Sequence, residues 1–403
     1  MTLRGKRLLL GITGGVAAYK AAQLARLLVK EGADVRVAMT EAATRFVTPV
    51  TLQALTGQPA WTDLWDPRVA DSMGHIEHSR DRELIVVAPA SADFLGKLAG
   101  GLADDLLSAL CLARRCPLMV APAMNVEMWE NAAMQRNVHT LRGDGVHVAG
   151  PAAGEQACGE VGMGRMLEPE EILAEIEAFF QPKALAGKRV VVTAGPTQEP
   201  IDPVRVLTNL SSGRMGYAVA RAAQEAGARV TLVSGPVALP TPAGVERVDV
   251  RTADEMLEAV KTAVKGSDVF IGVAAVADYK AKSRAAQKIK KGTARGLQLE
   301  FEENPDILAY VAGLKDRPFC VGFAAESERL AEHARAKRAR KGIPLLAANL
   351  VQRSLGAEEG EITLFDDAGE HCLGHGPKLA LARKLVAHIA GMLAGEKRAR
   401  AKA

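Results

Sequence analysis

The chain has 403 residues, more than one compact domain usually contains, so we expect two domains. Apolar residues make up 48% and charged residues 24% of the sequence, a balance that excludes a mainly disordered or collagen-like chain. The net charge is only +4 and aromatic residues make up 4%, which disfavours a nucleic-acid partner. The sequence has no CxxC pair and no apolar run long enough to cross a bilayer. These features favour a cytoplasmic protein with reduced thiols and without a membrane partner.

Two similar segments, LRGKRLLLGITGG and LAGKRVVVTAGPT, open the two halves of the chain. The apolar start resembles a signal peptide, but the mid-chain copy favours a strand in both places. The first half is predicted to continue with strand 8–12, helix 17–30 and strand 35–39, and the second half with strand 190–193 and helix 216–225. Each half is a β-α-β start. The pattern predicts an α/β fold of two tandem Rossmann-like parallel-sheet domains, over 1–182 and 187–403.

Further strands are predicted at 84–88, 118–121, 269–273, 319–323 and 345–348, and a late antiparallel edge strand at 361–365. A helix over 170–180 ends the first half, and the charged tail 396–403 is expected to be frayed and solvated. Gly5 and Gly187 correspond with an offset of 182, but Gly32 and Gly227 with an offset of 195, so the second half has thirteen extra residues. Such an insertion after a first strand is a common place for chemistry.

In the first half, polar and glycine residues follow the predicted strands. Gly14 and Gly15 lie between a strand and a helix, where free N–H groups can bind a phosphate, although many such turns carry glycine for geometry alone. Thr40, rather than an acid, follows the second strand. This favours a mononucleotide such as a flavin over NAD.

Three residues are candidates for catalysis. His75 lies in MGHIEH, Asn125 follows a strand in PAMN, and Cys158 lies in ACGEVGMGRM. The alternatives are a surface or capping histidine, a turn asparagine and a buried structural cysteine. The three glycines after Cys158 predict a mobile loop, and a thiol on a closing flap can act as an acid.

The strings GITGGVAAYK, MGHIEH, PASADFLGKLAGGLADDLL, PAMN and ACGEVGMGRM occur in this order over residues 6–180. They resemble the flavin-dependent cysteine decarboxylases, and in particular the decarboxylase half of the bacterial bifunctional phosphopantothenoylcysteine decarboxylase/phosphopantothenate–cysteine ligases of coenzyme A biosynthesis. Asp93 departs from the asparagine of many relatives. The resemblance implies bound FMN near Gly14, Gly15, Thr40, Ser91 and Ser108.

The same resemblance implies a reacting group of three residues. His75 orients the substrate carboxylate or takes the thiol proton, Asn125 holds the carboxylate, and Cys158 delivers a proton to the product. FMN supplies the electron sink for loss of CO2.

In the second half, the inserted TAGPTQEPIDPVRVLTNLSSGRMG leads into a helix. Asn209 and the serines after it suit an anion or a polar acid at a helix N-terminus, although a serine N-cap without a ligand is the simpler alternative. Asp278 follows a strand and precedes a basic stretch that is ordinarily a solvated loop. Lys337 and Lys341 share a face of either an exposed basic helix or a triphosphate site. No Walker sequence occurs, which excludes a P-loop enzyme.

The strings TAGPTQEPIDPVR, TNLSSGRMG, GVAAVADYK, KIKK, NPDIL, GFAAES and ARAKRARK resemble the phosphopantothenate–cysteine ligase domain over residues 188–390. The resemblance implies that CTP activates 4′-phosphopantothenate as an acyl-cytidylate, that L-cysteine attacks it, and that Mg²⁺ neutralises the phosphates. The sequence identifies no metal ligands. Asn209 is implied to stabilise the acyl-cytidylate or the charge that develops during the attack. The implied CTP site consists of Gly272, Val273, Ala274, Asp278, Lys288, Pro305, Asp306, Ile307, Leu308, Phe323, Lys337 and Lys341.

We therefore expect a bifunctional enzyme in which the ligase half acts first and the decarboxylase half second. The resemblance also implies a homo-oligomer, with trimeric flavin domains, dimeric ligase domains and possible dodecamers. Two other classes of protein remain open: a regulatory flavoprotein without catalysis, and a nucleic-acid binder that uses the basic helix.

Overall fold

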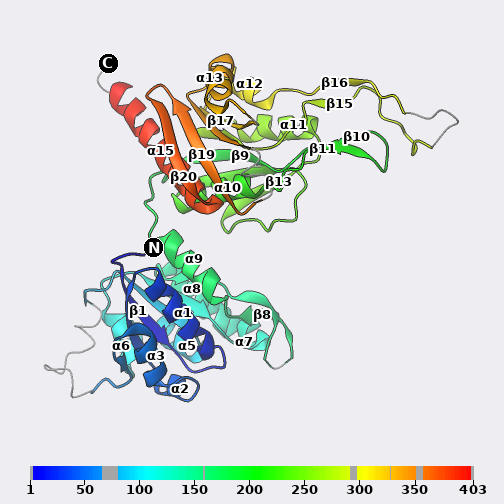
Figure 1. Cartoon of the computed structure of the whole chain (residues 1–403). Coiled ribbons are helices and arrows are strands. Elements are labelled where there is room, and N and C mark those ends of the chain that lie inside the picture. Colours follow the sequence, from blue (N-terminus) through cyan, green and yellow to red (C-terminus); the bar gives the residue numbers. More distant parts are fainter. Residues whose placement is uncertain are drawn as a thin grey trace. The chain divides into compact units, whose positions relative to one another are not determined.

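The computed structural model describes residues 3–65, 80–157, 159–290, 297–326, 328–350 and 357–400. His75 and Cys158 lie outside these residues. The chain divides into two compact units, Met1–Phe180 and Gln181–Ala403 (Figure 1), and each is described by itself.

The first unit is built on a parallel sheet with the order β3-β2-β1-β4-β5-β6. Strands β2 and β3 follow one another on one side of β1, and β4, β5 and β6 follow on its other side, so the strand order has a switch point between β1 and β4. Ligands of such sheets bind at the carboxyl ends of the strands beside the switch point. The strands are β1 (Arg7–Ile12), β2 (Asp34–Met39), β3 (Ala60–Trp61), β4 (Leu84–Ala90), β5 (Leu118–Pro122) and β6 (His147–Val148).

Helices cover both faces of this sheet, so the central strands β4 and β5 are apolar and buried along their whole length. Leu8 and Leu10 of β1 belong to one buried cluster, which includes helices α1 and α9, whereas Leu9 belongs to the opposite cluster with α5, α6 and α8. The helices are α1 (Ala18–Lys30), α2 (Glu41–Thr44), α3 (Pro49–Thr56), α5 (Ala92–Gly100), α6 (Leu106–Ala113), α7 (Val126–Glu130), α8 (Ala132–Gly143) and α9 (Pro169–Phe179).

The second unit repeats this order and extends it, as β13-β12-β9-β14-β17-β18-β19-β20. Its parallel strands are β9 (Arg189–Ala194), β12 (Arg229–Ser234), β13 (Val245–Asp249), β14 (Val269–Gly272), β17 (Phe319–Glu326) and β18 (Leu345–Leu350). The antiparallel strands β19 (Glu359–Asp366) and β20 (Gly369–Pro377) complete the sheet. The helices are α10 (Arg214–Glu225), α11 (Ala253–Ala263), α12 (Ile307–Ala312), α13 (Leu330–Lys341) and α15 (Lys378–Arg400).

Among the described residues, antiparallel pairs of short strands project from each of the two sheets. In the first unit, β7 (Ala152–Glu155) pairs with β8 (Val161–Arg165). In the second, the insertion forms β10 (Gln198–Pro200) and β11 (Val206–Thr208), and β15 (Tyr279–Ala281) pairs with β16 (Phe301–Glu303). The last two hairpins extend from the same end of the sheet, and β10 contacts β15 (Figure 1).

Three predictions were wrong. The strand at 361–365 is antiparallel but not an edge, because β20 pairs with its outer side. The tail is helical as far as Arg400, as the end of α15. The glycine-rich run around position 158 is not a mobile loop throughout: Val161–Arg165 is strand β8, and its glycines allow close packing, since a Cβ on Gly162 would lie 2.5 Å from Cγ2 of Val126.

Candidate functional site

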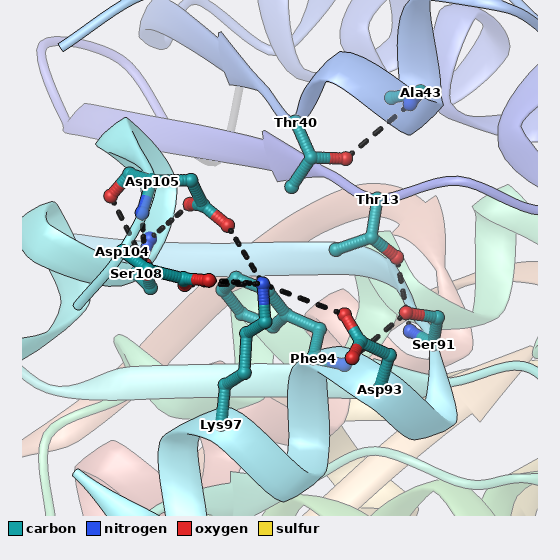
Figure 2. Close-up of polar contacts among 10 residues, drawn as sticks. All are labelled: Thr13, Thr40, Ala43, Ser91, Asp93, Phe94, Lys97, Asp104, Asp105 and Ser108. Carbon is teal, nitrogen blue, oxygen red and sulfur yellow. Dashed lines mark hydrogen bonds and ion pairs between the residues drawn. The ribbon is translucent and has the colours of Figure 1, made fainter. Parts of the chain in front are cut away.

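In the first unit, three hydroxyl groups follow the carboxyl ends of β1, β2 and β4 (Figure 2). Thr13 donates from Oγ1 to the Pro89 carbonyl oxygen at 2.8 Å. The same oxygen accepts from the Ser91 amide at 2.9 Å, a contact that Figure 2 shows. Thr40 and Ser91 are the N-caps of α2 and α5. The predicted residues Thr40 and Ser91 thus lie beside the β1/β4 switch point, where helix N-termini suit an anionic group.

The glycine turn after β1 leaves room for a ligand on one side only. A Cβ on Gly14 would lie 2.5 Å from the Cβ of Ala42, so this glycine permits close packing against α2. A Cβ on Gly15 would meet nothing within 4 Å. The backbone at Gly15 is therefore open to a bound group.

Ser108 has a structural role in the capping of α6. Its side chain is buried, its Oγ accepts from the Asp105 amide at 3.1 Å, and its own amide donates to Asp105 Oδ1 at 2.8 Å. This reciprocal pair fixes the start of the helix.

The acidic residue at position 93 lies beside a lysine. Lys97 Nζ lies 3.7 Å from Asp93, 3.0 Å from Asp104 and 3.6 Å from Asp105 (Figure 2). The hydrogen bond that Lys97 donates to Asp104, together with the charges of the neighbouring carboxylates, raises the pKa of Lys97. Asp93, at a position where many relatives have asparagine, thus has the positively charged Lys97 one helical turn away.

Asn125 contacts the β7–β8 hairpin. Its Nδ2 amide donates to a carboxylate oxygen of Glu160, and the Val126 amide donates to Gln156 Oε1 at 3.0 Å. The Met124 amide donates to the Gly164 carbonyl oxygen at 3.0 Å. The residues on both sides of Cys158 are therefore bonded to the PAMN segment. Glu160 and Gln156 were not singled out from the sequence, because these contacts join segments about thirty residues apart.

In the second unit, a cavity of about 790 Å³ opens at the β9/β14 switch point. Eleven of the twelve predicted nucleotide-binding residues line it, and so does Asn209. The exception is Lys288, which is exposed outside this lining. The eleven are Gly272, Val273, Ala274, Asp278, Pro305, Asp306, Ile307, Leu308, Phe323, Lys337 and Lys341.

The start of α10 forms one wall of the cavity. Its N-cap is Gly213, with φ 75° and no side-chain capping bond, so the simpler alternative of a serine N-cap is wrong. A Cβ on Gly216 would lie 2.4 Å from the Cβ of Ala194, so glycine allows this helix to approach β9. Asn209 Nδ2 donates to the Ala275 carbonyl oxygen at 2.8 Å. The first amides of α10 therefore face a cavity suited to an anion.

Basic side chains from α13 reach the same cavity. Lys337 Nζ donates to the Phe323 carbonyl oxygen at 3.0 Å, and Lys341 forms an ion pair with Asp306, the N-cap of α12. Burial lowers the pKa of both lysines. The basic helix is therefore only partly a solvated surface.

Two further polar residues of the cavity lining, Lys378 and Asn304, were not singled out from the sequence. Lys378, the first residue of α15, is 8% exposed, and burial, followed by the charge of Arg214, lowers its pKa. Asn304 donates to the Ala277 carbonyl oxygen at 2.8 Å, while its buried Oδ1 has no hydrogen-bond partner within the described part of the chain. Arg340, which belongs to the basic run seen in the sequence, also lines the cavity. The burial of Lys378 and Asn304 depends on elements that are distant in the chain.

Comparison with known proteins matches the two parts of the chain to two different families. The flavoprotein family matches residues 1–181, and the DNA/pantothenate metabolism flavoprotein C-terminal domain matches residues 185–393. The coenzyme A biosynthesis bifunctional protein CoaBC of Vibrio cholerae is 51% identical, over 94% of this chain and 97% of that protein. The chain belongs to the CoaBC family.

Other CoaBC proteins are similar over the same extent. That of Escherichia coli is 48% identical over 96% of this chain and 98% of its own length. The crystal structure of a CoaBC C-terminal domain is 39% identical and covers 53% of this chain and 99% of that chain, with a TM-score of 0.46. The expectation of a bifunctional α/β enzyme of coenzyme A biosynthesis, with a flavoprotein unit followed by a pantothenate-metabolism unit, is confirmed.

Within the described ranges, no helix of this CoaBC member is both long enough and apolar enough to cross a bilayer.

Proposed function

We propose that the second unit joins 4′-phosphopantothenate to L-cysteine at the expense of CTP, and that the first unit decarboxylates the product to 4′-phosphopantetheine with FMN. The observation that carries the proposal is the cavity at the β9/β14 switch point, which eleven predicted nucleotide-binding residues and Asn209 line together. A cavity of about 790 Å³ is large enough for a nucleotide and a second small substrate.

The ligase reaction has two steps. The carboxylate of 4′-phosphopantothenate attacks the α-phosphate of CTP and releases pyrophosphate. The amine of cysteine then attacks the acyl-cytidylate and releases CMP. Lys337 and Lys341 are well placed to bind the nucleotide, and Lys288 is proposed to reach it from the β15–β16 segment. Asn209, fixed by Ala275, offers polar atoms to the acyl-cytidylate.

A base with an exocyclic amino group fits one feature of the cavity wall. The buried Oδ1 of Asn304 has no partner among the described residues and can only accept a hydrogen bond. The amino group of cytosine would satisfy it, whereas the carbonyl group of uracil would not. Mg²⁺ is proposed to be held mainly by the nucleotide phosphates and water.

The first unit has the features that FMN requires. The open backbone at Gly15 and the N-termini of α2 and α5 suit the FMN phosphate. The other residues proposed to lie close to FMN are Gly14, Thr40, Ser91 and Ser108. When bound, FMN supplies the electron sink that allows CO2 to leave. We propose that Asn125 holds the substrate carboxylate, that His75 orients it or takes the thiol proton, and that Cys158 protonates the product carbon.

The contacts of Asn125 give its proposed role a physical basis. The Glu160 carboxylate accepts from its Nδ2 amide, and Asn125 Oδ1 accepts from the Met128 amide at 3.2 Å. Both polar ends of the side chain are thereby oriented.

We further propose a cytoplasmic homo-oligomer, with trimeric flavin units and dimeric ligase units in a dodecamer.

One experiment tests both halves. The purified chain is incubated with Mg²⁺, 4′-phosphopantothenate and cysteine, together with CTP, UTP or ATP, and pyrophosphate and CO2 are followed separately. We expect CTP-dependent pyrophosphate release followed by CO2 release, and little activity with UTP. A colourless protein that forms neither CMP nor CO2 would refute the proposal. A yellow protein without turnover would favour a regulatory flavoprotein.

A further inference from the structure

Three potential metal ligands converge where β19, β20 and α15 meet, within the second unit. Asp366 ends β19, His371 lies on β20 after a tight turn, and His388 lies on α15. Nε2 of His371 lies 3.0 Å from Asp366 Oδ1, and Nε2 of His388 lies 2.8 Å from Oδ2. One ligand atom from each residue can be chosen so that all three lie within 4.8 Å of one another.

The carboxylate at the centre of this group is held in place. Asp366 Oδ1 also accepts from the amides of Ala368 at 2.8 Å and Gly369 at 3.1 Å, so the turn fixes its orientation. Its side chain is 5% exposed, whereas those of His388 and His371 are 23% and 36% exposed. The Asp366 carboxylate is therefore buried and already oriented, whereas the two imidazoles remain accessible to solvent.

The types of ligand in the group favour Zn²⁺ over Mg²⁺ or Ca²⁺. The same turn carries Asp367 and Glu370, which form ion pairs with Arg338 and Arg335 of α13. These pairs leave the Asp366 carboxylate as the anion nearest the two imidazoles. An imidazole–imidazole–carboxylate set matches the ligands that Zn²⁺ takes, rather than the all-oxygen sets of Mg²⁺ or Ca²⁺.

We propose that Asp366, His371 and His388 form a Zn²⁺ site, with water as the fourth ligand. Tetrahedral Zn²⁺ with bonds of about 2.0–2.1 Å separates neighbouring ligand atoms by about 3.3 Å. The separations of 3.0 and 2.8 Å lead to different oxygens of Asp366, and the three ligand atoms lie within 4.8 Å of one another, so the ion would draw the two imidazoles towards a single carboxylate oxygen. On binding, each Nε2 directs its lone pair to the ion, and the proton that it now donates to Asp366 resides on Nδ1 instead.

The position of the site gives the ion a structural consequence. Helix α15 begins at Lys378, in the wall of the cavity, and carries His388 ten residues later. Bound Zn²⁺ would tie this helix to β19 and β20. The site is separate from the residues proposed to bind CTP, and its test does not depend on the ligase reaction.

The test measures metal binding by the full chain, after treatment with a chelator and removal of the chelator. Co²⁺ is titrated first, because its absorption reports tetrahedral nitrogen and oxygen ligands, and Zn²⁺ is then used to displace it. We expect His388→Gln and His371→Gln each to abolish the same single equivalent, or to weaken Zn²⁺ binding at least about 100-fold. Glutamine keeps an amide that can still bond Asp366, so the fold should survive.

His375→Gln is the matched control, since His375 lies on the same strand, 3.7 Å from Glu359 and outside the group. It should bind Zn²⁺ as the unaltered chain does. Zn²⁺ should also raise the Tm of the unaltered chain and of His375→Gln, but not that of His388→Gln. Unchanged stoichiometry and affinity in both His371→Gln and His388→Gln would overturn the proposal and leave a hydrogen-bonded cluster only.

Discussion

The side chain of Asn209 is fixed against the backbone of Ala275 by a 2.8 Å hydrogen bond from its Nδ2 amide to the carbonyl oxygen. The bond joins the segment that enters α10 to the segment that leaves β14, across the switch point of the sheet. An amide is suited to this position because it can donate to Ala275 and still present an oxygen.

Replacing Asn209 with aspartate should separate the two ligase steps. A carboxylate cannot donate to Ala275 and adds negative charge to a site for phosphates. We expect cysteine coupling to fall at least about 100-fold while acyl-cytidylate accumulates, as measured by rapid quenching and chromatography. Asn131→Asp is the control, because Asn131 caps α8 in the other unit and aspartate is an equally good N-cap. Wild-type turnover in Asn209→Asp would contradict the proposed role.

Lys378 is expected to bind a phosphate of one of the two ligase substrates. Lys378→Met should raise the KM for CTP or for 4′-phosphopantothenate about 10- to 100-fold, because charge-assisted hydrogen bonds contribute about 1.5–3 kcal/mol. Methionine fits a buried position, so the fold should be retained. Lys384→Met, on the exposed face of the same helix, should leave both KM values unchanged. If Lys378→Met alters neither KM, the residue is structural.

The protonation of Lys378 gives a second readout. Burial, followed by the nearby Arg214, lowers the pKa of Lys378, so its ammonium loses a proton at a lower pH than an exposed lysine does. Anion binding should therefore weaken as the pH rises towards that pKa. An arginine stays charged throughout this range. Lys378→Arg should accordingly keep its KM to higher pH than the unaltered chain, and identical pH profiles would argue against the assignment.

Gly162→Ala should impair the decarboxylase and spare the ligase. The new Cβ would lie 2.5 Å from Cγ2 of Val126 and push the β7–β8 hairpin away from the PAMN segment. We expect CO2 release to fall at least tenfold while pyrophosphate release continues, with a local cost of about 1–3 kcal/mol. Val126→Ala should partly restore activity by removing the clashing methyl groups. Gly143→Ala, where a Cβ meets nothing within 4 Å, is the control.

The described thiols should differ sharply in reactivity. Burial raises the pKa of Cys111 to about 12 and that of Cys320 to about 11, so both stay protonated at neutral pH, whereas Cys372 is exposed. Iodoacetamide at pH 8 should label Cys372 in the native protein and label Cys111 and Cys320 only after unfolding. Peptide mass spectrometry measures the rates. Rapid native labelling of Cys111 would show that the packing around α6 is open.

The local features of the fold were predictable from sequence, and the features that depend on distant pairing were not. Apolar runs such as Val190–Thr193 predict buried strands because both faces of such a sheet are covered. Strand β20 has no such pattern: its three glycines and polar residues become a strand only because β19 pairs with it. Helix α15 was overlooked, although Leu381, Leu385 and Ile389 repeat every four residues.

The candidate site follows the same rule. Asn209, Lys337 and Lys341 were recognisable because they lie in strings that resemble a known family. Asn304 begins the NPDIL string but was not singled out, because its burial appears only in the folded chain. Lys378 lies outside the quoted strings, and only the folded sheet makes it part of the cavity. Glu160 acquires a role only through its bond to Asn125.

The two units share one strand order but differ in what is attached to it: a thirteen-residue insertion after β9, and β19, β20 and α15 at the carboxyl end. Strand β19 and helix α15 are part of the interior of the second unit, because Leu364, Leu385 and Ile389 belong to its buried core. An exchange of these elements in an engineered chain would therefore require that core to be redesigned as well.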